Sequence, residues 1–262
     1  MGVSRRGLFT LGFLAGARDD AREEIDYDGA SDRVVAGWER GDHDALMRAL
    51  EPVALELVEA AGVGQGDAVL AAAAGDGNVP AAALAAGAEV EACDLALAMV
   101  ARGRARVPRA NWLRADVQDM PYPNGAFDHV LSSFGAVLAP RARRTARELV
   151  RVCAPGGTVA LTAWTPDSLP GRIEQLVRRP AGVRSPTDWG REEVARRRFE
   201  SLLEDVTVQT RTIQLTFPDE DVLLAAFLRP HGIEQAPHLR GYGAEVRAQY
   251  LLVRGRRPGL SS

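Results

Sequence analysis

The sequence contains little cysteine and little histidine. Its 262 residues include two cysteines, Cys93 and Cys153, and four histidines. The cysteines form no CxxC motif and no two histidines lie at metal-ligand spacing, so we expect neither a disulfide framework nor a bound metal. No apolar run reaches the roughly 18 residues that a membrane-spanning helix requires. These absences argue against a disulfide-stapled, a metal-dependent and a membrane-spanning protein.

A large excess of charge of either sign is also absent. The formal net charge is −3, which gives no electrostatic reason to expect a nucleic-acid partner. Acidic residues are interspersed with the arginine-rich stretches, such as 141–147 and 196–198, and we interpret these stretches as solvated helix faces. The length and the apolar content of 46% suit one globular α/β domain with a small accessory region. Nothing in the sequence indicates an oligomeric state.

Short apolar segments alternate with segments of helical periodicity along the middle of the chain. The expected strands are 68–72, 89–93, 112–115, 127–132 and 158–162, and the expected helices are 44–62, 81–86, 96–107 and 141–152. This alternation predicts an α/β fold of the Rossmann-like kind, a doubly wound and mostly parallel sheet with helices on both faces. Beyond Trp164 an arginine-rich helical segment, 191–203, precedes two expected strands, 206–217 and 250–253, which suit an antiparallel sheet edge.

The first glycine-rich turn follows the expected strand 68–72. Doubly wound sheets bind ligands outside the carboxyl ends of their strands, and residues 73–78 (Ala-Ala-Gly-Asp-Gly-Asn) occupy such an end. Small residues let a ligand approach the backbone closely, and the helix start that follows offers free N–H groups. A single G-x-G turn is also compatible with a purely structural role, so the turn alone does not identify a ligand.

Carboxylates follow the next two expected strands. Asp94 comes 17 positions after Gly77, close to the interval at which nucleoside-binding folds place the acid that binds a ribose diol. Asp116 follows the third strand, where it can accept a hydrogen bond from an exocyclic adenine amine, while Leu95 and Val117 flank the ring. Each acid alone can equally be a helix cap or a surface carboxylate. Their order at successive strand ends favours a nucleoside site.

Residues 67–165 resemble the core of the class I S-adenosylmethionine (SAM)-dependent methyltransferases. Residues 69–78 resemble the first motif of the family, Asp94-Leu95 its ribose motif and 115–117 its adenine motif, and 120–128 and 147–157 are similar to the segments that follow. The resemblance implies SAM as cofactor and a seven-stranded sheet whose last strand is antiparallel. The residues implied to hold SAM are Ala73, Gly75, Asp76, Gly77, Asn78, Asp94, Leu95, Asp116, Val117 and Ser133.

The first motif departs from the family pattern at two positions. The family usually carries an acidic residue where this chain has Ala71, and often a threonine or serine where it has Asp76. The missing carboxylate normally helps to hold the methionine end of SAM. Our hypothesis is that Asp76 substitutes in part by pairing with the ammonium group of the ligand.

The implied activity is in-line methyl transfer to an oxygen, nitrogen or carbon nucleophile of a small molecule. Positioning supplies much of such catalysis, and the sequence assigns no catalytic residue. His231 and His238 lie in a loop-rich stretch from which either could reach a substrate pocket, and we interpret each as a solvated loop residue. The aromatic residues of 165–245 favour a partly apolar acceptor. Ser132, Ser133, Phe134, Trp164 and Thr165 are expected near it.

Two other functions compete with the methyltransferase. The first is a non-catalytic SAM-binding or regulatory protein on the same fold, suggested by Ala71 and by the absence of a visible base. The second is a nicotinamide-dependent oxidoreductase, which Pro80 disfavours because it stands where a G-x-G-x-x-G motif needs its third glycine.

The first twenty residues allow two interpretations. Ser4-Arg5-Arg6 and the apolar stretch up to Ala17 are typical of a twin-arginine export signal, whereas a short arm is the plainer interpretation. We favour the arm and a cytoplasmic protein, because SAM is made and kept in the cytoplasm. The expected organisation is an arm (1–20), N-terminal helices covering the cofactor site (21–66), a SAM-binding core (67–165), and C-terminal helices with the last two strands on the substrate side (166–262).

Overall fold

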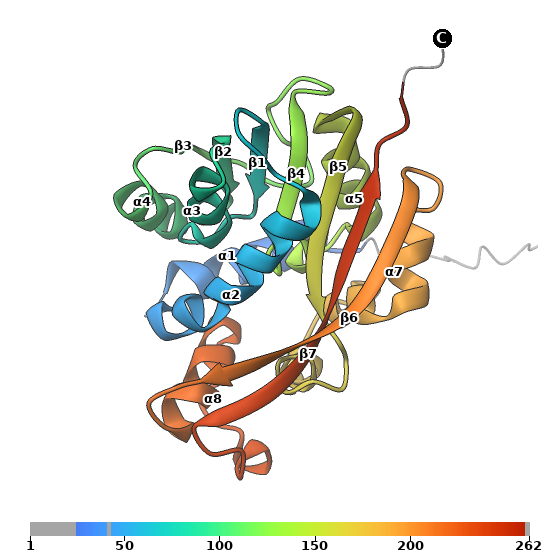
Figure 1. Ribbon diagram of the computed structural model, residues 1–262. Coiled ribbons are helices and arrows are strands. Elements are labelled where there is room, and N and C mark those ends of the chain that lie inside the picture. Colours follow the sequence, from blue (N-terminus) through green and yellow to red (C-terminus); the bar gives the residue numbers. More distant parts are fainter. Residues whose placement is uncertain (1–24, 41–42, 260–262) are drawn as a thin grey trace, which may run out of the picture.

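A seven-stranded sheet forms the centre of the molecule (Figure 1), whose computed structural model describes residues 25–40 and 43–259. The strand order is β3-β2-β1-β4-β5-β7-β6. The strands are β1 (Ala68–Ala72), β2 (Glu89–Asp94), β3 (Asn111–Arg114), β4 (Phe127–Ser133), β5 (Cys153–Trp164), β6 (Glu204–Thr216) and β7 (Glu245–Arg256). The first five strands are parallel, and β7 is antiparallel to both β5 and β6. The predicted fold class is therefore confirmed. The predicted arm, residues 1–20, lies outside the described residues.

Helices cover both faces of this sheet. They are α1 (Tyr27–Glu39), α2 (Asp44–Ala61), α3 (Asn78–Ala85), α4 (Leu97–Arg106), α5 (Ala142–Val152), α6 (Leu169–Leu176), α7 (Glu192–Phe199) and α8 (Glu220–Leu228). One apolar core joins α2, α3 and α8 to the sheet, and a second core joins α5 and α7 to it. The two cores are separate because successive strand residues point to opposite faces.

The periodicity of α2 explains its place in the first core. Leu46, Leu50, Val53 and Leu57 recur at helical spacing and are all buried. The helix ends at Ala61 and is capped by Gly62, whose left-handed φ of 75° lets its N–H bond to carbonyls of the last turn. In β1, by contrast, the apolar run 69–72 is fully buried, as expected for a strand covered on both faces.

The C-terminal part of the sheet differs most from expectation. β7 runs from Glu245 to Arg256, much longer than the predicted 250–253, because it pairs along its length with β6 and also with β5. The hairpin of β6 and β7 extends past the ends of the other strands and carries α8 beside its far end (Figure 1). Helices α1, α6 and α8 were not assigned bounds from the sequence. Among the described residues, no helix is both long and apolar enough to cross a membrane.

Candidate functional site

A cavity lies at the carboxyl ends of the parallel strands. Residues at or just beyond the carboxyl ends of β1, β2, β3, β4 and β5 line it from the sheet side, and α1, α2, α6, α8 and the short 3-10 helix η3 (Arg229–His231) contribute to the remaining walls. One end of the cavity contains Asp94 and Asp116, and other parts of its wall are aromatic, with Phe134, Trp164 and Phe227. This is the position at which doubly wound sheets bind ligands.

Two strained turns form the floor of this cavity. Ala73, just after β1, has a φ of 50°, and Phe134, just after β4, has a φ of 58°. Positive φ is uncommon for residues with a side chain, and strain of this kind concentrates at functional sites. The turns touch, because a Cβ atom on Gly135 would lie only 2.3 Å from the carbonyl oxygen of Ala73. The close contact fixes the two strand ends relative to each other.

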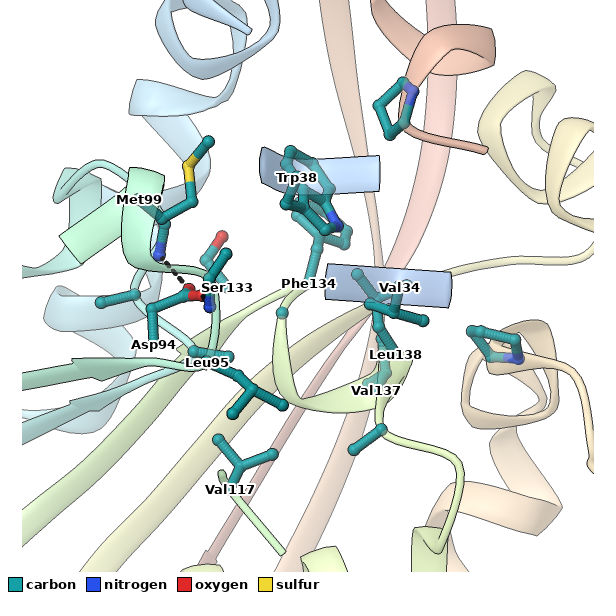
Figure 2. Close-up of a pocket in the computed structure, with 18 of the residues that line it drawn as sticks. Val34, Trp38, Asp94, Leu95, Met99, Val117, Ser133, Phe134, Val137 and Leu138 are labelled. Carbon is teal, nitrogen blue, oxygen red and sulfur yellow. Dashed lines mark hydrogen bonds between the residues drawn. The ribbon is translucent and has the colours of Figure 1, made fainter. Parts of the chain in front are cut away.

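Asp94 is held rigidly at the end of β2. Its Oδ2 accepts a hydrogen bond from Gly75 N at 2.9 Å, and its Oδ1 accepts one from Ala96 N at 2.9 Å. Burial raises the pKa of this carboxyl, and the two backbone hydrogen bonds only partly offset that effect. No cationic side chain pairs with it among the described residues, so its free lone pairs suit neutral donors such as hydroxyl groups. Figure 2 shows Asp94 beside Leu95 at the cavity.

Asp116 is fixed by Gln118. The side-chain amide of Gln118 donates to both carboxylate oxygens of Asp116, at 3.1 and 2.9 Å, and its backbone N–H donates to Oδ1 at 2.8 Å. Gln118 is held in turn, because its Oε1 accepts a hydrogen bond from Arg141 N at 2.9 Å. Val117 lies between the two polar residues and also lines the cavity (Figure 2). Asp116 and Gln118 therefore offer a polar edge, and Val117 offers an apolar face beside it. This arrangement suits a heteroaromatic ring.

Eight of the ten predicted cofactor-binding residues line this one cavity. They are Ala73, Gly75, Asn78, Asp94, Leu95, Asp116, Val117 and Ser133. Of the residues expected near an acceptor, Ser133, Phe134 and Trp164 line the cavity as well, whereas Ser132 and Thr165 do not. The hydroxyl of Ser132 instead accepts a hydrogen bond from Ala136 N.

Asp76 and Gly77 are the two predicted cofactor-binding residues that do not line the cavity. The carboxylate of Asp76 pairs with Arg106 at 2.9 Å, so the expected contact with a ligand ammonium group does not match its orientation. Burial raises the pKa of Asp76, although the charge of Arg106 opposes this effect. Gly77 serves packing, since a Cβ atom there would lie 2.8 Å from Val107 and 3.2 Å from Trp112. The chain leaves the cavity wall at these two residues and returns to it at Asn78.

Helix α1 closes one side of the cavity. Its residues Ser31, Val34 and Trp38 line the cavity, and Figure 2 shows Val34 and Trp38 on α1. The carboxylate of Glu39 accepts hydrogen bonds from Leu97 N at 2.5 Å and from Ala98 N at 3.2 Å, which ties α1 to the start of α4. The carboxylate complements the N-terminal end of the α4 dipole.

Aromatic rings form another part of the cavity wall. Phe134 and Trp164 stack with their centroids 3.9 Å apart and their planes 9° from parallel. Phe227 meets Trp164 edge-on at 6.2 Å, and Tyr250 supports the Phe134 ring from outside the cavity at 5.6 Å. Such packing restricts the motion of the rings and leaves an apolar surface suited to a flat or apolar ligand.

His231 is the site residue that the sequence interpretation placed wrongly. It lines the cavity rather than lying in solvent, and its Nε2 is 3.1 Å from Oε1 of Glu174, a buried residue of α6. Arg179 binds the other carboxylate oxygen of Glu174 at 2.5 Å. His238 is exposed, as expected. No local sequence pattern predicts this cluster, because its residues lie in segments that are far apart in the sequence and meet only when the chain folds.

Comparisons with known proteins agree with this fold. A sequence profile for the methyltransferase domain matches residues 70–161. The chain is 37% identical over 198 residues to an uncharacterized protein of Mycobacterium tuberculosis, covering 70% of this chain and 72% of that protein. It is 32% identical over 156 residues to a demethylmenaquinone methyltransferase of Beutenbergia cavernae, covering 58% of each. The crystal structure of the YcgJ protein of Bacillus subtilis shares the fold, with a TM-score of 0.57 at 16% identity over 79% of this chain and 98% of that one.

Proposed function

Because the chain belongs to the class I SAM-dependent methyltransferases, we propose that it methylates a small, largely apolar molecule. The observation that carries the proposal is a single cavity that is lined both by Asp94 and Asp116 and by the stacked Phe134 and Trp164. A nucleoside cofactor and an apolar acceptor both need a place in a methyltransferase. The cavity offers surfaces of both kinds.

The residues at the polar end fit SAM. In the proposal, Asp94 accepts hydrogen bonds from the ribose hydroxyls and Asp116 accepts one from the adenine amine, with Leu95 and Val117 against the two ring faces. The fit rests on the donor set: the carboxylate of Asp94 is buried, has no cationic partner among the described residues and keeps lone pairs for neutral donors. When bound, SAM supplies a methyl group that its positively charged sulfur has already activated.

The chain itself contributes position and exclusion of water. Val34 and Trp38 of α1 cover the cavity with apolar surface, which lowers the local dielectric and keeps water from competing as a nucleophile. The contact between Ala73 and Gly135 fixes the cofactor end relative to the aromatic wall. Holding two reactants in a productive arrangement is worth a large part of the barrier in a displacement reaction.

The aromatic wall supports an apolar acceptor. Phe134, Trp164 and Phe227 offer ring faces and edges, and the cavity contains no lysine or arginine among its lining residues within the described ranges. An acceptor that carries a phosphate group would therefore find no lysine or arginine there to balance its negative charge. One relative, the demethylmenaquinone methyltransferase, is named for an apolar acceptor of this kind.

Cofactor binding is tested first by calorimetric titration of the purified protein with SAM. We expect Asp94→Asn to weaken binding about ten- to a hundredfold, since a lost hydrogen bond to a charged group is worth about 1.5–3 kcal/mol. Asp32→Asn, at an exposed position of α1, is the matched control and keeps wild-type affinity. Equal SAM affinity of wild type and Asp94→Asn would contradict the assignment of Asp94.

Catalysis is tested separately with SAM carrying an isotope-labelled methyl group. The protein is incubated with a panel of small aromatic and aliphatic molecules that carry hydroxyl, amine or thiol groups. Label in an apolar member of the panel, together with release of S-adenosylhomocysteine, supports the methyltransferase. SAM binding without transfer to any member favours the competing function, a SAM-binding protein that does not methylate.

A further inference from the structure

A buried charged cluster stands at the cavity wall away from Asp94 and Asp116. Glu174 and His231 line the cavity, and Arg179 lies behind Glu174. The exposed fractions of the three side chains are 10%, 18% and 17%. Within the described ranges, the titratable residues that line the cavity are these two and the aspartates Asp94 and Asp116. The cluster is not used by the cofactor site described above.

The contacts of this cluster define the state of the imidazole. Oε2 of Glu174 is occupied by Arg179, and Oε1 faces Nε2 of His231 at 3.1 Å. An unprotonated ring nitrogen and an ionised carboxylate oxygen would repel each other at this distance, so Nε2 carries the hydrogen. Neutral imidazole has one N–H, so Nδ1 is then an unprotonated acceptor. A carboxylate that fixes a histidine tautomer in this way is the arrangement of a histidine base.

The free nitrogen is accessible. Nδ1 of His231 has no hydrogen-bond partner within the described chain. Among the described residues, four side-chain atoms are both fully buried and without a partner, and Nδ1 of His231 is not one of them. It therefore keeps accessible surface. Glu174 and His231 also border a second hollow, which Arg33, Arg178 and Arg184 line and which adjoins the first. Solvent in this second hollow can accept a proton from the imidazole.

Charge balance does not explain why a histidine is present. Arg179 by itself neutralises Glu174, and it also donates to the carbonyl oxygens of Glu174 and Val177. Burying a further polar ring in a wall that includes Pro230 and Leu138 costs desolvation free energy without need. An imidazole that lines a ligand cavity, with one nitrogen against a carboxylate and the other accessible, is better explained by chemistry.

We propose that His231 is the general base of the reaction, that Glu174 orients it, and that the acceptor is a hydroxyl group on an aromatic or enolic ring. The inference rests on the proposed function. As the acceptor reacts, its O–H bond breaks, the proton goes to Nδ1, and the electron pair of that bond stays on the oxygen as the nucleophile. Glu174 stabilises the imidazolium that forms, and the proton then leaves to solvent.

The need for a base selects the hydroxyl among possible acceptors. A neutral amine already has a free lone pair, and a thiol ionises readily near neutral pH, so neither requires a buried base. A ring hydroxyl is a poor nucleophile until its proton leaves. The stacked pair of Phe134 and Trp164 offers the flat apolar surface on which such a ring lies.

The first test reads the tautomer of His231 directly and needs no turnover. Nitrogen-15 spectra of the full-length protein, labelled in its histidine rings, are recorded at mildly alkaline pH, and His231→Gln assigns the signals. We expect neutral imidazole with hydrogen on Nε2 in the wild type, and averaged tautomers in Glu174→Ala, whose folding is checked by its SAM affinity. An Nδ1–H tautomer in the wild type would overturn the proposal, because that nitrogen could then accept no proton.

The second test compares two matched acceptors, naphthol and naphthylamine, with labelled SAM. We expect transfer to naphthol, an about 10²- to 10⁴-fold slower transfer in His231→Gln, and unchanged SAM affinity in that variant. His238→Gln, an exposed histidine, is the control and keeps the wild-type rate. Transfer confined to naphthylamine, or an unchanged naphthol rate in His231→Gln, contradicts the base assignment but leaves the proposed function intact. SAM binding without transfer to either compound or to any panel member contradicts the proposed function, and the base assignment falls with it.

Discussion

Replacing Gly135 by alanine should damage stability and cofactor binding together. The new Cβ would lie 2.3 Å from the carbonyl oxygen of Ala73 and 2.7 Å from its Cβ. Real Cβ atoms essentially never approach closer than 3.0 Å, so the two turns must separate by at least 0.7 Å, the difference between 3.0 and 2.3 Å. The obstacle is backbone rather than a flexible side chain, and it cannot rotate away.

The magnitude of this effect has two opposing parts. Overpacking costs about 1–3 kcal/mol. Gly135 has φ −79° and ψ −51°, which alanine adopts freely, so the loss of unfolded-state entropy returns about 0.4–1 kcal/mol. We expect a net loss of about 1–2 kcal/mol in the free energy of unfolding. The displaced Ala73 also moves the turn that leads to Gly75, so SAM affinity should fall about tenfold or more.

Urea unfolding and calorimetric titration with SAM measure the two effects. Gly64→Ala is the matched control, because a Cβ atom there meets only a carboxylate oxygen of Asp67, at 3.6 Å. It should change the unfolding free energy by less than about 0.5 kcal/mol and leave SAM affinity unchanged. If Gly135→Ala behaves like this control in both assays, the contact between the turns is not the rigid element that the geometry implies.

Two further substitutions separate structural from ligand-binding carboxylates. Asp76→Asn should keep wild-type SAM affinity and lose less than about 1 kcal/mol of stability, because Arg106 retains Glu51 as a partner at 2.6 Å; weaker SAM binding would restore the ligand-ammonium hypothesis. Glu148→Gln should cost about 1–3 kcal/mol at neutral pH. Burial alone raises the pKa of Glu148, but hydrogen bonds from Arg151 and Met120 N outweigh it and lower the pKa below 4.5. Its contribution is therefore complete above pH 4.5 and is lost as the pH falls through the lowered value, so unfolding curves of wild type and variant should converge in acid.

The parallel part of the fold follows from local sequence patterns. The predicted strand 68–72 has the observed bounds, and the other four central strands are offset or extended only at their ends. Their apolar runs are short and bounded by turn residues, and the run in β1 is buried on both faces as its sequence predicts, whereas β3 at the sheet edge is mostly exposed. The length of β7 does not follow from its local sequence, because pairing with β5 and β6 fixes it. Tertiary contacts decide what local propensity leaves open.

The two ends of the cavity differ in how far the sequence reveals them. Asp94 and Asp116 are predictable because the carboxyl ends of parallel strands meet at one edge of a sheet, so a residue's place in the strand order gives its place in space. His231 and Glu174 belong to η3 and α6, two segments outside that alternation. Their contact depends on how α6 and α8 pack beside the sheet, for which no spacing rule exists.

The glycine turn after β1 is coupled to the turn after β4 by direct contact. Gly75 N donates to Asp94, and two residues earlier Ala73, held in left-handed backbone, touches Gly135. Phe134, also left-handed, precedes Gly135 and stacks on Trp164. One short path of backbone contacts therefore joins the carboxylate at the polar end to the aromatic wall. The contact between Ala73 and Gly135 is one of those that hold both strained turns in place, which is why a single methyl group at position 135 should be felt at both ends of the cavity.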